Sequence, residues 1–292
     1  MSEKKFVVVT GGAGFVGSHL CERLVKEGYQ VISLDNYFTG SEDNHVDGVE
    51  YRRGHTKDIA LLIPETPDIL FHLGEYARTG PSLFEPELVF DLNTVGTLGV
   101  LAYWKEKKCK LVYAGSSTKF VNDGKEIAGR DRAPYNFSKA VNSELLHNYG
   151  RWYELPYSVA YFYNVYGPRE RAGQFNGGYG TVVETFRQNK LNHEQAVIYG
   201  TGEQVRAFTH VLDTVEALLV IAEKGGPDEY AISAAEEFTL NQLAAMFGLE
   251  PEYREATRNS RSAGTEDTTK LQALGWKQQH TLPSYIKESL TI

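Results

Sequence analysis

The first 165 residues alternate short apolar runs with stretches of helical periodicity. Most of the apolar runs lack a polar face, so strands formed by them must be covered on both sides. Such strands belong in a parallel sheet with helices on both faces, built from strand–helix–strand units. The pattern predicts a doubly wound α/β fold with strands at 6–10, 30–35, 49–52, 69–73, 110–114 and 157–163, and helices at 18–26, 88–106 and 138–154.

The pattern changes after Tyr163, which indicates a domain boundary. Gly167 and Pro168 end a run, and residues 173–180 contain four glycines with aromatic residues between them. Segments 204–209 and 228–232 again look like short strands, so we expect the chain to return to the first sheet there. The predicted domains are 1–165 plus about 204–232 for the sheet, and about 166–203 and 233–292 for a smaller, discontinuous C-terminal domain.

Composition excludes several classes of partner. The chain has 30 Lys and Arg against 38 Asp and Glu, a net charge of −8 that opposes binding to nucleic acid or anionic lipid. The conspicuous apolar run 217–222 is far below the roughly 20 residues of a membrane span, and four apolar residues at 6–9 are too few for a signal peptide. Cys21 and Cys109 are too few for a disulfide framework or a cysteine-based zinc site. We expect a cytoplasmic protein without a metal.

A glycine-rich segment, GGAGFVG at 11–17, directly follows the first predicted strand and precedes a helical pattern. A dinucleotide pyrophosphate needs backbone N–H groups at a helix N-terminus and no side chains in its approach. Gly12 and Gly14 would leave room for that approach, and Gly17 would let the helix pack closely on the strand. This context predicts a dinucleotide site.

Asp35 ends the predicted strand 30–35 and lies 18 residues after Gly17. A carboxylate here accepts hydrogen bonds from both hydroxyls of the adenosine ribose and repels a 2′-phosphate. The position therefore favours NAD over NADP. The alternative is an ordinary aspartate in a turn at the end of a strand.

Tyr135 and Lys139 are four residues apart, and a helix would place them on one face. The positive charge of a lysine favours the phenolate form of a neighbouring tyrosine, which can then take a proton from an alcohol. The hydroxyls at 116–118 follow the predicted strand 110–114, at the sheet edge where such folds bind ligands. The alternatives are an exposed helix pair and a polar exit from a strand.

Taken together, these motifs resemble the extended short-chain dehydrogenases, specifically the NAD-dependent nucleotide-sugar epimerases and dehydratases. The resemblance implies a Rossmann sheet, NAD as cofactor and a nucleotide sugar as substrate. It spans nearly the whole chain and rests on the motifs at 10–17, 35–36, 58–59, 72–73, 93–97, 116–118, 135–139, 163–169 and 199–206.

The resemblance also implies roles for individual residues. The cofactor-binding residues are expected to be Gly11, Gly14, Phe15, Val16, Gly17, Asp35, Asn36 and Leu73, with Asp58 and Ile59 at the adenine and with Tyr135 and Lys139. The catalytic group is expected to comprise Ser116, Tyr135 and Lys139, with Ser117 or Thr118 as an alternative register for the serine.

Substrate contacts are expected from a third group of residues. Asn164 and Arg206 match family positions that hold the substrate pyrophosphate, and Arg261 is a further candidate whose alternative is an exposed salt bridge. Glu75 and Arg78 stand where the family usually has small residues, which predicts that they, like Ser117 and Thr118, lie near the sugar. The alternative for Glu75 and Arg78 is an ion pair on a loop.

The reaction is inferred from residues 117 and 118. Family members first remove a proton and a hydride from the sugar to give a 4-keto sugar. Dehydratases then use an Asp and a Glu that directly follow the catalytic Thr. UDP-glucuronate decarboxylases carry a Glu at the second of these two positions. Ser117 and Thr118 have hydroxyls instead, which are not competent acids or bases near neutral pH. Epimerisation needs no further acid or base, because the ketone can turn over and receive hydride on its other face. We therefore expect C4 epimerisation of a nucleotide-activated hexose, and the resemblance alone favours UDP as the nucleotide.

Other reactions and functions are compatible with the same motifs. A 4-dehydrogenase or ketoreductase that releases the keto sugar would use the same Tyr, Lys and Ser, and a dehydratase or decarboxylase is a further alternative. A non-catalytic nucleotide-binding protein is the most distant one, because a binding module needs no base. The family commonly dimerises through the two helices expected at 88–106 and 138–154, so the resemblance also implies a homodimer.

Overall fold

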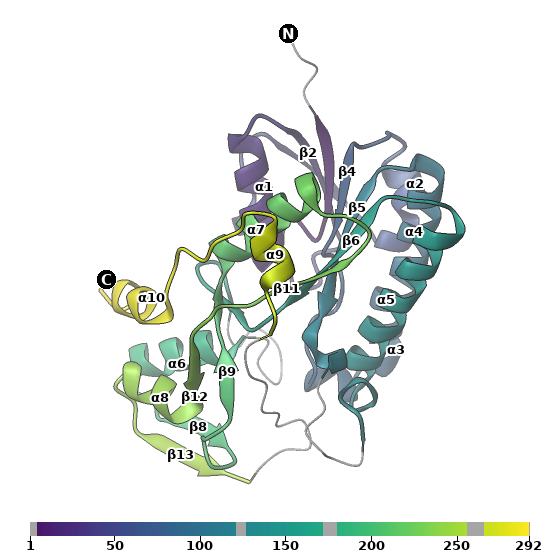
Figure 1. Ribbon diagram of the computed structural model, residues 1–292. Helices are drawn as coiled ribbons and strands as arrows, with labels where there is room; N and C mark the ends of the chain where they lie inside the picture. Colours follow the sequence, from purple (N-terminus) through teal and green to yellow (C-terminus); the bar gives the residue numbers. More distant parts are fainter. Residues whose placement is uncertain (1–4, 121–126, 172–179, 256–265, 292) are drawn as a thin grey trace.

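A seven-stranded sheet forms the centre of the protein (Figure 1). The computed structural model describes residues 5–120, 127–171, 180–255 and 266–291. The strand order is β11-β6-β5-β4-β1-β2-β3, and every neighbouring pair is parallel. The strands are β1 (Phe6–Thr10), β2 (Gln30–Asp35), β3 (Val49–Arg53), β4 (Ile69–His72), β5 (Lys110–Ser116), β6 (Tyr157–Phe162) and β11 (Glu229–Ile232). The predicted parallel sheet is confirmed.

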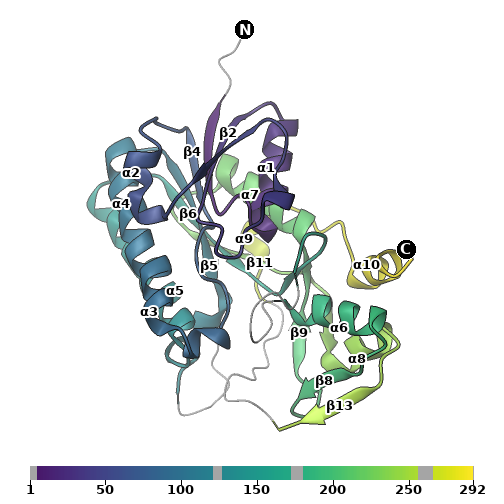
Figure 2. The same cartoon turned by 180° about the vertical axis from the view of Figure 1, so that it is seen from behind.

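Helices cover both faces of this sheet, as Figures 1 and 2 show. One core lies between the sheet and α2 (Ile59–Leu62), α4 (Gly96–Lys107) and α5 (Pro134–Trp152). The other lies between the sheet and α1 (Phe15–Lys26), α7 (Val211–Lys224) and α9 (Thr269–Ala273). No helix in the described ranges is long and apolar enough to cross a membrane.

The helix expected at 88–106 is interrupted by a π-helical turn. It consists of α3 (Pro86–Val89), the π-helical turn Phe90–Val95 and α4. Asn93 is buried on this turn; its amide Nδ2 donates to the Tyr76 carbonyl (3.1 Å) and to Ser138 Oγ (3.0 Å). The irregular turn thereby connects the loop after β4 to α5. Such π-helical turns are frequent at functional sites.

A smaller lobe packs below the carboxyl ends of the large sheet (Figure 1). Its own core includes Phe186, Ile198, Phe247 and Leu282. The lobe contains α6 (Val182–Leu191), α8 (Leu240–Met246), α10 (Leu282–Ser289), β8 (Ala196–Tyr199), β9 (Val205–Ala207), β12 (Glu237–Thr239) and β13 (Pro251–Arg254). β8 pairs with β13, and β9 pairs antiparallel with β12.

The expectation that 204–209 returns to the large sheet is wrong. β9 pairs with β12, and β10 (Thr209–His210) pairs with β7 (Val165–Tyr166) in a separate two-stranded sheet. β9 is short and half exposed, which suits an antiparallel pair with one solvated side better than a sheet covered on both faces. The chain returns to the large sheet through α7 and β11 instead.

Candidate active site

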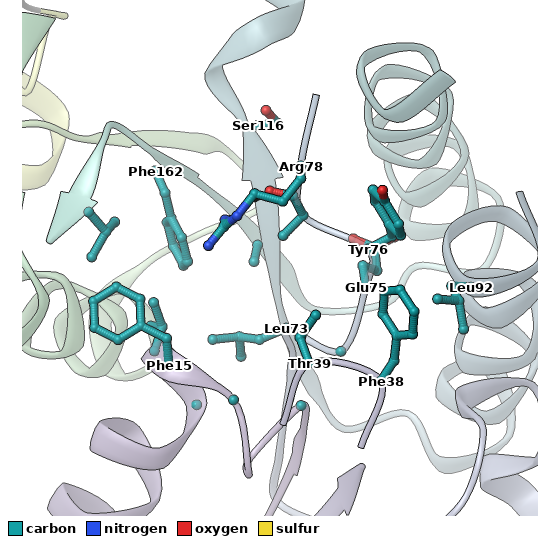
Figure 3. Close-up of a pocket in the computed structure, with 18 of the residues that line it drawn as sticks. Phe15, Phe38, Thr39, Leu73, Glu75, Tyr76, Arg78, Leu92, Ser116 and Phe162 are labelled. Atoms are coloured by element: carbon teal, nitrogen blue, oxygen red, sulfur yellow. Dashed lines mark hydrogen bonds between the residues drawn. The ribbon is translucent and has the colours of Figure 1, made fainter. Parts of the chain in front are cut away.

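A cavity of about 420 Å³ opens at the carboxyl ends of the parallel strands (Figure 3). β1 and β4 are neighbours at the point where the strand order reverses, which is where doubly wound sheets bind ligands. The cavity brings together most of the residues predicted from the sequence: Gly11, Gly14, Phe15, Val16, Gly17, Asp35, Asn36, Leu73, Glu75, Arg78, Ser116, Ser117, Thr118, Tyr135, Lys139 and Asn164.

The glycine loop has little room for side chains. Gly11 has a positive φ of 76° and lines the cavity. A Cβ on Gly17 would stand 2.0 Å from the Gly11 carbonyl oxygen, so the close approach of α1 to the loop requires glycine. Gly12 differs from expectation: it is buried, and its Cβ would meet Ser33 Oγ on β2 at 2.4 Å. Gly12 therefore serves packing behind the loop.

Asp35 lies at the edge of the cavity with its carboxylate fixed. It accepts hydrogen bonds from the backbone N–H groups of Ala13 (2.9 Å) and Tyr37 (2.8 Å). Burial raises the pKa of Asp35, and these two N–H groups oppose that effect. A tight glycine cradle beside a carboxylate that ends β2 fits the pyrophosphate and adenosine ribose of NAD.

Some predicted residues lie outside this cavity. Asp58 is exposed at the start of α2, and the Ile59 side chain is fully buried in the core, so only its backbone is available to a ligand. Neither of them, nor Arg206 on β9, is among the described residues that line the cavity. Arg261 is outside the described residues.

The predicted catalytic residues come from two elements that meet at the cavity. Tyr135 and Lys139 are both on α5, which begins at Pro134, and Ser116 is the last residue of β5. The hydroxyls of Ser116 and Thr118 are hydrogen-bonded at 2.9 Å. The phenol, the ammonium and the serine hydroxyl therefore border one space together with the glycine loop.

Glu75 forms a buried ion pair with Lys139, whose ammonium also donates to the Ala114 carbonyl. The Glu75 side chain is 3% exposed, and its Oε1 accepts hydrogen bonds from Asn142 Nδ2 (2.7 Å) and Thr97 Oγ1 (2.8 Å). The alternative expected for Glu75 was an ion pair on a loop. In the structure Glu75 does form an ion pair, but the pair is buried and the partner is the predicted catalytic lysine. No sequence signal joins these two residues.

The electrostatics around Glu75 are unusual for a carboxylate without solvent. Burial by itself would raise the pKa of Glu75, but the charge of Lys139 and the nearby hydrogen bonds hold that pKa below its usual range. His72 lies behind the pair, and burial lowers its pKa to about 4. The site therefore contains an ionised glutamate beside a neutral histidine.

Two further charged residues, Arg78 and Glu170, line the cavity. Arg78 extends from its loop into the cavity, toward Phe162 and Phe15 (Figure 3). Glu170, which sequence reasoning missed, directly follows the Gly167–Arg169 part of the motif and accepts hydrogen bonds from the Thr181 N–H (2.6 Å) and Thr181 Oγ1 (2.9 Å). Burial raises the pKa of Glu170 to about 7.

Asn164 is held in place by its own hydrogen bond. Its side-chain Nδ2 donates to the Ala207 carbonyl at the end of β9 (2.7 Å), and its backbone has a positive φ of 39°. The residue thus joins the cavity to the smaller lobe. Within the described ranges, no group of three or more His, Cys, Asp or Glu side chains is arranged to bind a metal ion.

Known proteins resemble this chain over most of its length. A putative UDP-glucose 4-epimerase of Methanocaldococcus jannaschii is 28% identical over 297 aligned positions, 96% of each chain. UDP-glucuronic acid decarboxylase 1 of Xenopus tropicalis is 30% identical over 260 residues, which cover 84% of this chain and 60% of the relative. This chain thus spans less than two thirds of that decarboxylase.

A solved structure matches the fold closely. The UDP-glucose 4-epimerase of Thermotoga maritima, crystallised with UDP-glucose, is 29% identical, and the match covers 97% of both chains with a TM-score of 0.89. The sequence profile of the NAD dependent epimerase/dehydratase family matches residues 7–233. The chain belongs to the NAD-dependent epimerase/dehydratase family, and NAD is its cofactor.

Proposed function

We propose that this protein is a nucleotide-sugar epimerase that inverts C4 of a UDP-hexose through a transient 4-keto sugar. The observation that carries the proposal is the convergence of Tyr135, Lys139 and Ser116 on the cavity bordered by the glycine loop. An epimerase and a UDP-glucose-bound structure among the similar proteins support UDP as the nucleotide.

Different side chains have different roles at the sugar hydroxyl. Tyr135 takes the hydroxyl proton as general base, Ser116 hydrogen-bonds the same oxygen, and Lys139 lies one helical turn after Tyr135. Gly11, Gly14 and Asp35 would hold the cofactor. When bound, NAD supplies the acceptor and donor of the hydride.

Epimerisation is favoured over dehydration and decarboxylation by the side chains next to Ser116. Ser117 and Thr118 line the cavity with hydroxyls, and the Thr118 hydroxyl is already bonded to Ser116. Glu75 also lines the cavity, but Lys139 and neutral donors occupy its carboxylate oxygens. It is therefore not free to remove a proton from the sugar.

A second candidate is decarboxylation of a UDP-uronic acid. The similarity to UDP-glucuronic acid decarboxylases favours it, and Arg78 extends into the cavity as a cation that a sugar carboxylate would attract. Glu170, with a pKa of about 7, would be its only titratable acid within the described lining that is suited to neutral pH.

We also propose that the protein acts as a cytoplasmic homodimer. Its two cysteines are free, which agrees with a reducing compartment. Four large apolar residues are exposed here: Phe90 and Val95 on the π-helical turn, Leu98 on α4 and Phe137 on α5. The rings of Phe90 and Phe137 contact each other. Apolar surface of this kind suits helix packing between two copies.

The deciding experiment is conversion of UDP-hexoses followed by NMR without added reductant. We expect interconversion of C4 epimers and a loss of about 10²- to 10⁴-fold in Tyr135→Phe, which keeps the ring and NAD binding but removes the base. Lys139→Ala should lose a similar factor and Ser116→Ala less, and the effects should not add because the groups act on one hydroxyl. UDP-glucuronate in a parallel tube tests the second candidate. Wild-type turnover by Tyr135→Phe, or no conversion of any nucleotide sugar with NAD bound, would refute the proposal.

A further inference from the structure

A directional chain of hydrogen bonds leads from Thr10 on β1 to Glu75, the partner of Lys139. Thr10 Oγ1 accepts two backbone N–H groups of the loop after β4, so its own proton must go to His72 Nδ1 (2.8 Å). His72 then carries its proton on Nε2 and donates it to Thr97 Oγ1 (3.0 Å). Thr97 in turn donates to Glu75 Oε1 (2.8 Å). The chain ends on a group that can only accept.

Glu75 accepts hydrogen bonds from four side chains on three elements, α4, α5 and β5. Asn142 Nδ2 from α5 (2.7 Å), the Tyr113 hydroxyl from β5 (3.2 Å) and Thr97 from α4 all donate to Oε1, and Lys139 donates to Oε2. Thr97 Oγ1 already accepts from His72 and from Asn142, so it donates its own proton to Glu75, and the Lys139 ammonium has donors only. These fixed donors and the charge of Lys139 favour an ionised Glu75 and hold its pKa below the usual range.

Lys139 is correspondingly enclosed. Its side chain is 5% exposed, its ammonium donates to Glu75 and to the Ala114 carbonyl, and it lies 4.4 Å from the centre of the Tyr113 ring. The titratable groups around the pair are His72 at the end of β4, Tyr113 on β5 and Tyr135 on α5. His72 and Tyr113 are held neutral by burial, which lowers the pKa of the first and raises that of the second.

We propose that Glu75 is a positioning residue that anchors Lys139 and offsets the positive charge acting on Tyr135. Tyr135 lies one helical turn before Lys139 on α5 and lines the same cavity, so a carboxylate held against the ammonium reduces the net positive charge that the phenol faces. The proposal concerns charge at the catalytic pair; only its kinetic arm rests on the proposed function.

The test is a cycle of isosteric variants read by tyrosinate absorbance. Each protein is titrated beside its Tyr135→Phe counterpart, and the difference isolates the ionisation of Tyr135 without any substrate. Glu75→Gln should move that ionisation to lower pH by on the order of one pH unit. Lys139→Met should move it to higher pH, and the double variant, again neutral, should return close to the wild-type value.

Tyr113→Phe is the matched control, because it removes a hydrogen bond to Glu75 without changing the charge of the pair. If Glu75 had only a structural role, the Tyr135 titration midpoint would be unshifted in both Glu75→Gln and Tyr113→Phe. That result overturns the proposal. If Glu75→Gln does not fold, Lys139→Met and the double variant still decide: equal midpoints in the two contradict the proposal.

The kinetic arm separates this inference from the proposed function. The pH–rate profile of epimerisation by Glu75→Gln should shift in the same direction as its tyrosinate titration. A shifted titration in a protein that converts no UDP-hexose would leave the role of Glu75 standing and refute epimerisation. Epimerisation by Glu75→Gln together with an unshifted Tyr135 titration would support the proposed function and refute the role of Glu75.

Discussion

The Gly17 Cα faces the Gly11 carbonyl oxygen so closely that a Cβ on Gly17 would stand 2.0 Å from it. This contact joins the first turn of α1 to the loop after β1 and gives the loop its shape. The atoms nearest to an added methyl group are all backbone atoms of Gly11 and Gly12, so no flexible side chain can move aside.

Gly17→Ala should therefore lower both stability and NAD affinity, because the loop must move away from the cofactor cradle. We expect the dissociation constant for NAD, measured by calorimetry, to rise at least about tenfold, and the melting temperature to fall. Gly226→Ala is the control, since a Cβ there meets nothing within 4 Å. Equal NAD affinity in Gly17→Ala and wild type would show that the loop does not form the cradle.

Asp35→Ala should weaken NAD binding and narrow the gap between NAD and NADP. The variant removes the acceptor for the ribose hydroxyls and the negative charge that repels a 2′-phosphate. Titration with each cofactor measures both effects. Asp47→Ala, which removes an exposed carboxylate outside the described cavity lining, should leave both affinities unchanged. Unaltered affinities in Asp35→Ala would contradict its assignment.

His72 should make the folded protein less stable in mild acid. Burial lowers its folded pKa to about 4, whereas the unfolded value is near 6.5, so the unfolded chain binds the proton first as the pH falls. Stability is thus lost between these values, by about 2 kcal/mol from pH 7 to pH 5 for this group. Urea unfolding at both pH values should give a smaller difference for His72→Gln.

The pH dependence of the unfolding free energy that remains in His72→Gln has a second source. Burial also lowers the pKa of His210 to about 4, so His210→Gln should reduce the pH dependence independently. The same slope in wild type and His72→Gln would mean that His72 titrates normally in the folded protein.

Leu98→Glu should disrupt the homodimer. Leu98 is 42% exposed on α4, within the proposed interface, and a charge there would be buried between two copies. Light scattering should report twice 32.7 kDa for wild type and a single chain for the variant. Leu61→Glu, at an exposed position on α2, is the control. A monomeric wild type at micromolar concentration would exclude the dimer.

Local patterns were sufficient for much of the fold and site. The predicted strand 6–10 coincides with β1, and Tyr135 and Lys139 are on one helix as their spacing predicts. These features depend on hydrophobic periodicity and on residues within one helical turn of each other, so a short stretch of sequence is enough to predict them. The strand-to-glycine-to-helix order likewise predicted where the cavity lies.

Long-range pairing was decided only by the tertiary structure. The partner of Glu75 is 64 residues further along the chain, Gly12 meets Ser33 across two elements, and β9 pairs with β12 in the smaller lobe. Each of these contacts depends on how separate elements pack, and a residue's own neighbours in sequence do not encode it. The amino-acid sequence by itself determined the Rossmann sheet, the cofactor loop and the Tyr–Lys pair, whereas packing determined that a buried carboxylate stands against the lysine, because only the folded chain brings α5 and the loop after β4 to the same point.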